Sequence, residues 1–143
     1  MKKFVFSLEK VLSFKGQMLD VKKNELANLQ MQLRQVEQKI ENLNNEFALN
    51  NQKMVLEMQN GLTPKDIEIY KIYFNSVNQN LKKLAVEKMQ LLNLIEQKKQ
   101  EIIELNSEIS GLERLKEKQL DLYFKATRKA EELAIEEFVS QGH

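Results

Sequence analysis

The sequence predicts an all-α fold in which two long helices form an antiparallel coiled-coil hairpin and the second, longer helix overhangs at its C-terminal end. The 143 residues contain four Gly and one Pro, too few to turn a chain between several short strands. Apolar residues instead recur at alternating steps of three and four, which is the heptad pattern of a coiled coil. The helix-breaking residues near mid-chain cluster at 60–64. We therefore expect one coiled-coil domain spanning 1–143.

The first helix is predicted at about residues 4–59. Its heptad series runs through Leu12, Lys15, Leu19, Lys22, Leu26, Leu29, Leu33, Val36, Ile40, Leu43, Phe47, Asn50 and Met54. Every member except Lys15, Lys22 and Asn50 is apolar. The two lysines are expected to pack their stems in the seam and extend their amines outward. Asn50 is interpreted as a residue that specifies the register of the helices.

A loop is predicted at residues 60–63. Asn60 and Gly61 suit the left-handed conformation that ends a helix. Thr63 suits the N-cap of the next helix, and Pro64 its first position. Asp66 is placed to complete a capping box.

The second helix is predicted at about residues 64–139. Its series runs through Ile67, Tyr70, Phe74, Val77, Leu81, Leu84, Lys88, Leu91, Ile95, Lys98, Ile102, Leu105, Ile109 and Leu112. Because each helix alone leaves its apolar stripe in water, the two are expected to fold back on each other. A loop centre near residue 62 pairs Phe47 with Val77 and Leu12 with Leu112.

The second helix continues well past the end of the first in this register. The roughly 20 additional residues form an overhang of about 30 Å with no partner in their own chain. The overhang carries Leu122, Tyr123, Phe124, Ala126, Ala130, Leu133, Ile135 and Phe138. Its apolar residues spread around the helix, which is typical of a segment that enters a socket.

Composition argues against several classes of function. A net charge of +1 supplies no broad basic field for a nucleic acid. The chain has no Cys and one His, His143, so thiolate or multi-histidine metal sites are excluded. The 61–65 segment lacks the Lys-Ser/Thr pair of a phosphate-binding loop. No enzyme activity, cofactor or direct small-molecule ligand is therefore expected.

The termini and the loop carry the most distinctive sequence features. These are the N-terminal run Phe4-Val5-Phe6-Ser7-Leu8-Glu9-Lys10-Val11-Leu12, the mid-chain Asn60-Gly61, the aromatic start of the second helix at Tyr70, Tyr73 and Phe74, and Phe138 after Glu136 and Glu137. Together they resemble the flagellar export protein FliJ family over nearly the whole chain.

The resemblance implies a stalk, similar in shape to the central stalk of rotary ATPases, that inserts into the hexameric ring of the flagellar export ATPase. It also implies contact with the cytoplasmic domain of the membrane export gate, a part in handling export chaperones, and a cytoplasmic position at the inner face of the cell membrane. The ring contact it implies comprises Phe4, Phe6, Leu8 and Leu12 with Leu122, Phe124, Leu133 and Phe138. The gate contact it implies comprises Tyr73, Val77, Asn80 and Leu84, of which Val77 and Leu84 also lie in the predicted seam.

Other interpretations remain open at this point. A related virulence type III secretion system would use a stalk of the same shape. The chain could also be a self-associating structural coiled coil. A binder of nucleic acids or membrane surfaces is least favoured, and it would use Lys2, Lys3, Lys10, Lys15, Lys22 and Lys23.

Overall fold

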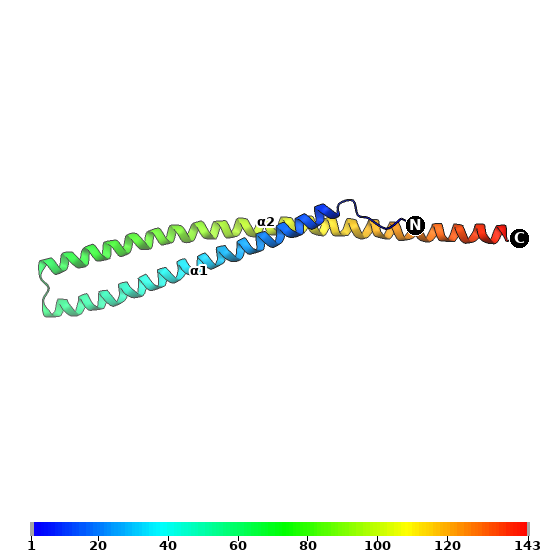
Figure 1. Ribbon diagram of the computed structural model, residues 1–143. Helices are drawn as coiled ribbons and strands as arrows, with labels where there is room; N and C mark the ends of the chain where they lie inside the picture. Colours follow the sequence, from blue (N-terminus) through cyan, green and yellow to red (C-terminus); the bar gives the residue numbers. More distant parts are fainter. Residues whose placement is uncertain (1, 143) are drawn as a thin grey trace. The chain divides into compact units, whose positions relative to one another are not determined.

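The computed structural model describes residues 2–142 and contains two helices joined by a short loop, α1 (Glu9–Asn60) and α2 (Pro64–Gln141) (Figure 1). α1 has 52 residues and α2 has 78. The all-α fold with a longer second helix is confirmed. Met1 and His143 lie outside the described residues, so the structure gives no information on the single histidine. Contacts divide the chain into two units, 1–23 with 100–143 and 24–99, and both helices run through each.

The loop in unit 24–99 has the conformation that its residues predict. Gly61 has φ +91°, in the left-handed region, whereas Asn60 remains the last residue of α1. The Asp66 amide donates to the Thr63 hydroxyl at 3.2 Å, and the Thr63 amide donates to the Asp66 carboxylate at 3.3 Å. These reciprocal bonds are a capping box, which satisfies free donors at the start of α2.

The core of unit 24–99 lies along the predicted seam between the helices. Val36, Val77, Leu91 and Ile95 are buried, and the Phe47 and Phe74 rings meet edge to face at 4.9 Å. Phe47 thus packs against a residue within one turn of Val77, its predicted partner. The α1 members of the seam in this unit, from Leu26 to Met54, are all half-buried or buried.

Ile67 is wrongly placed in the seam, because its side chain is 54% exposed. The inward position of the first turn of α2 is taken by Asp66, which is half-buried and turned back to Thr63 by the capping box. The seam of α2 therefore starts one turn later, at Tyr70.

Interhelical ion pairs follow the seam of the unit formed by 1–23 and 100–143. Glu9 pairs with Lys116 at 2.8 Å, Lys15 with Glu108 at 2.6 Å, and Lys22 with Glu101 at 3.0 Å. Residue numbers rise along one helix as they fall along the other, so the helices are antiparallel. Leu12 and Leu112, the predicted pair, are both half-buried between the first two of these bridges.

Lysines in the seam reach acidic residues on the opposite helix. Lys15 and Lys22 do so in the unit just described, and in unit 24–99 Lys98 contacts Glu25 at 2.6 Å. Each lysine keeps its stem in the seam and its amine at the edge, as the sequence predicts. Such pairs are partly exposed and individually weak, so their main effect is on register.

α1 begins at Glu9, five residues later than predicted, because the preceding residues alternate instead of following a helical period. Phe6 is buried at 4% exposure and Phe4 is half-buried, while Val5 between them is 79% exposed. A repeat of two is typical of extended chain. We call residues 2–8 the N-terminal strap.

The strap packs on α2 at Tyr123. The Phe4 and Tyr123 rings are 5.5 Å apart, and the Tyr123 hydroxyl donates to the Lys2 carbonyl. The overhang of α2 therefore becomes fully exposed only after Thr127, and residues 128–142 are all exposed. In the part of the chain that the structure describes, neither helix has an apolar stretch long enough to cross a membrane.

Replacing Gly61 by Ala should destabilise the hairpin by about 1–2 kcal/mol, because a Cβ is disfavoured at a left-handed φ even though the added methyl meets no neighbouring atom. Gly111→Ala is the matched control. Gly111 lies inside α2 with equally open space, so its replacement should stabilise by about 0.5–1 kcal/mol. Urea unfolding measures both changes, and a stabilised Gly61→Ala would mean that the loop is not formed in solution.

Candidate partner-binding surfaces

The residues implied as the ring contact all lie in the unit of 1–23 and 100–143, but they form two different sets. The members from the strap and the start of α1 pack within the chain. Phe6 is buried, and Phe4, Leu8 and Leu12 are half-buried. The members from α2 face solvent, with exposures of 55% for Leu122, 53% for Phe124, 54% for Leu133 and 78% for Phe138.

The exposed α2 members belong to what we call the terminal segment, residues 121–142. Leu122 and Leu133 are eleven residues apart, about three turns, so they lie along one side of the helix. Phe124 and the exposed Ile135 have the same spacing and lie along another side. The apolar surface of the segment is therefore wide, as the sequence predicts, and suits a partner that surrounds the helix.

Tyr123 is a structural residue that the site prediction missed. It is half-buried, its ring packs against the Phe4 ring at a tilted angle of 52°, and its hydroxyl donates to the backbone of the strap. Continuing the three-four steps from Leu112 through half-buried Lys116 and Gln119 leads to Tyr123, so the periodicity could have found it. The strap and Tyr123 together continue the packing against α2 beyond Glu9, the first residue of α1.

The residues implied as the gate contact do not form one exposed surface. Val77 is 4% exposed and Leu84 is half-buried, as their seam positions require. Tyr73 is half-buried, and its hydroxyl accepts a hydrogen bond from the Asn50 side chain at 2.7 Å. Only Asn80 of the four is exposed. Burial, together with a hydrogen bond to Glu46 and its charge, raises the pKa of Tyr73.

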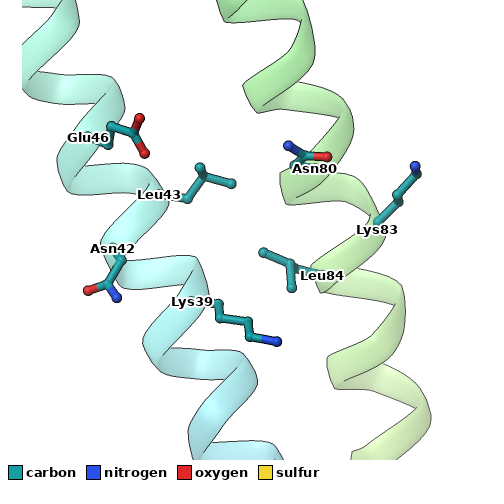
Figure 2. Close-up of a pocket in the computed structure, with 7 residues that line it drawn as sticks. All are labelled: Lys39, Asn42, Leu43, Glu46, Asn80, Lys83 and Leu84. Atoms are coloured by element: carbon teal, nitrogen blue, oxygen red, sulfur yellow. The ribbon is translucent and has the colours of Figure 1, made fainter.

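Asn80 and Leu84 line a groove between the helices in unit 24–99. The groove has a volume of about 430 Å³ and is lined by Lys39, Asn42, Leu43, Glu46, Asn80, Lys83 and Leu84. Figure 2 shows Leu43 and Leu84 pointing toward one another from α1 and α2. We call it the central groove. Its leucine floor and its rim of amides and charges can take a polar side chain or a short peptide segment.

A second tyrosine ties the helices together near the loop. The Tyr70 hydroxyl donates to the Glu57 carboxylate at 2.6 Å, and its ring stacks on Phe74 at 6.1 Å. The hydrogen bond, burial and the negative charges of Glu57 and Asp66 raise the pKa of Tyr70 from 10.0 to about 12. The tyrosine therefore stays neutral and bonded well into the alkaline range.

Exposed apolar side chains near the loop were also missed by the sequence analysis. They lie off the seam on both helices and comprise Val55, Leu56, Met58, Ile69 and Ile72. No periodic signal distinguishes them, since large apolar residues on a helix surface are common in any chain.

The described residues offer surfaces and no metal-binding cluster. Among residues 2–142 there is no cluster of three or more His, Cys, Asp or Glu side chains that could hold a metal ion. What the site residues provide is a wide apolar helix, a strap that supports it, and a groove with a polar rim. This combination defines a coiled-coil interaction protein.

The comparison with protein families is specific. Residues 4–143 match the model of the family described as Flagellar FliJ protein. The chain belongs to the FliJ family, and it is a flagellar export-related protein. The comparisons with curated proteins and with solved structures give no match.

The contribution of Tyr70 to stability should depend on pH. Because its folded pKa of about 12 lies above its ordinary value of 10.0, the stabilisation is complete below pH 10 and is lost as pH rises to about 12. Tyr70→Phe should be less stable than the wild type at neutral pH, and the gap should close over that range. Urea unfolding at stepped pH measures it. A gap that stays constant would mean that the Glu57 bond is absent.

Proposed function

We propose that this protein is a stalk-like component of flagellar export that binds the hexameric export ATPase through its terminal segment and promotes the function of the ring. It also contacts the cytoplasmic domain of the membrane export gate and takes part in handling export chaperones. It works in the cytoplasm, at the inner face of the cell membrane.

The observation that carries this proposal is the exposed terminal segment on a chain of the FliJ family. Residues 128–142 extend α2 beyond the last contact of the strap, and all are exposed. Leaving a large apolar side chain in water forgoes about 1.5–3 kcal/mol of burial free energy. Several large apolar side chains exposed on one segment favour an interaction site there.

The strap and the start of α1 support this contact indirectly. Phe4 packs on Tyr123 and Phe6 is buried, so both hold the first residues of the terminal segment in a helix joined to the hairpin. We assign these residues the role of fixing the base of the segment. The side chains that enter the ring are those of Leu122, Phe124, Leu133 and Phe138.

The symmetry of the partner determines how the stalk works. One asymmetric helix cannot make equal contacts with six equivalent subunits at once. Its contacts are therefore few and of modest affinity, and they shift among subunits. Binding some subunit conformations better than others biases the ring toward them, which raises turnover.

We assign the gate contact to the central groove, because Tyr73, Val77, Asn80 and Leu84 do not form one exposed surface. Asn80 supplies an exposed amide at its rim, and Leu84 forms part of its floor. Val77 is buried in the seam, and Tyr73 beside it bonds to Asn50 of α1, so both act by holding α2 against α1 next to the groove. A gate segment that places a polar side chain at Asn80 would bind here.

The ring contact is tested by Leu133→Ser with Phe138→Ser in the full chain. Both side chains are exposed, at 54% and 78%, so thermal stability should change little while stimulation of the ATPase is lost. The matched control is Leu56→Ser with Ile72→Ser, whose side chains are 62% and 63% exposed. ATPase turnover is measured at a fixed ratio of stalk to ring. Equal stimulation by the double variant and the wild type would contradict the ring contact.

The gate contact is tested by Asn80→Lys, which adds a long cation at the rim of the groove. Binding to the gate domain, measured by titration calorimetry, should weaken at least about tenfold, or ~1.4 kcal/mol. Asn78→Lys is the control, because Asn78 is an exposed residue of the same helix that does not line the groove. If both variants bind equally, the gate contact lies elsewhere.

A further inference from the structure

The terminal segment carries a charged line whose order is unusual. Lys125, Lys129, Glu132 and Glu136 are separated by steps of four, three and four residues, so they lie along one line of α2. The basic residues come first and the acidic residues second. All four side chains are exposed.

This order is unfavourable for a helix by itself. Carboxylates near a C-terminal end meet the negative end of the helix dipole, and the last turn of α2 contains no basic residue. Intrahelical pairs are also stronger when the acidic residue precedes the basic one, as with Asp121 and Lys125, which pair at 3.1 Å. Glu132 and Glu136 have the reverse order relative to Lys125 and Lys129. Their charges are better satisfied by an external cationic surface.

We propose that the terminal segments of two copies of this chain pair in antiparallel orientation. A two-fold axis between residues 130 and 131 places Lys125 opposite Glu136 of the second copy. The same register places Lys129 opposite Glu132 of the second copy. Each contact occurs twice because the two copies are equivalent, which gives four ion pairs. The antiparallel arrangement also brings the acidic end of each helix beside the basic residues of the other.

An apolar line runs beside the charged one and fits this register. Leu122, Ala126, Ala130 and Leu133 follow steps of four, four and three on the adjacent side of α2. In the proposed pair, Leu133 of one copy lies opposite the space between Ala126 and Ala130 of the second copy. The small alanine side chains let the helices approach closely, so the two leucines become covered. The charge order thus selects a second copy as the partner for this face.

The pairing goes beyond the proposed function and uses part of the same surface. A terminal segment that is paired with a second copy cannot also be surrounded by the ATPase ring. Pairing therefore keeps its apolar side chains covered until a ring displaces the second copy. The interface involves only the terminal segment of each copy, so the surface area it buries is below that of a typical stable complex. The pair is therefore weak and depends on concentration.

Sedimentation equilibrium of the full-length protein tests the proposal without any other component. As concentration rises, the mass should increase from 16.8 kDa toward twice that value. Lys125→Glu with Lys129→Glu should weaken the pairing at least about tenfold, since four attractive contacts become repulsive. Glu132→Lys with Glu136→Lys should do the same.

Mixing the two charge variants should restore pairing, because the charged line of one variant is then wholly acidic and that of the other wholly basic. This arm also shows that both variants are folded. Lys71→Glu with Lys82→Glu is the control, since both lysines are exposed in unit 24–99 and the wild-type behaviour should be kept. A mass of 16.8 kDa at every concentration would overturn the pairing, as would charge variants that pair like the wild type. A monomer that still stimulates the ATPase would leave the ring contact standing.

Discussion

The structure depends on reciprocal burial of two apolar stripes, one on each helix. Neither helix has another surface on which to bury its stripe, so the loop must reverse the chain and bring the stripes into register. The left-handed Gly61 and the capping box at Thr63 and Asp66 make that reversal local and short. This register also determines which partners the polar residues of the seam meet on the opposite helix. Lys15, Lys22 and Lys98 form ion pairs with carboxylates of the opposite helix. The Asn50 side chain donates a hydrogen bond to the Tyr73 hydroxyl.

The seam also separates residues that hold the hairpin from residues that can meet a partner. A side chain at a three-four position is covered by the opposite helix. This is why Val77 is buried while Asn80, three residues beyond it, is exposed. Tyr73 lies beside the seam and is half-buried, with its hydroxyl bonded to Asn50. The surfaces that we propose for partners therefore lie where the pairing is incomplete. They are the central groove, where the helices leave space between them, and the terminal segment, where α2 has no helix opposite it.

Because the two helices differ in length, the end of α2 is left with exposed apolar side chains. α1 has 52 residues and α2 has 78, so α2 continues past the start of α1 with large apolar side chains spread around it and exposed. The strap extends the covered region as far as Tyr123, and the exposed surface starts one turn later. The proposed ring contact and the proposed pairing both use the terminal segment of α2. The two proposals depend on different side chains. The ring contact depends on large apolar side chains, and the pairing depends on the order of the charged ones.

The sequence alone predicts the two helices, the loop with its caps and nearly every seam position, because these follow from local periodicity and from backbone preferences of a few residues. The resemblance to the FliJ family, carried by the termini and the loop, is confirmed by the family match. Tertiary contacts decided the features that have no local signal. α1 starts at Glu9 because Phe4 packs on Tyr123 of α2 and Phe6 is buried, which favours an extended chain before the helix. Ile67 is exposed while Asp66 is half-buried, with its carboxylate bonded to the Thr63 amide in the capping box. The burial of each aromatic ring depends on which residue of the other helix lies opposite it.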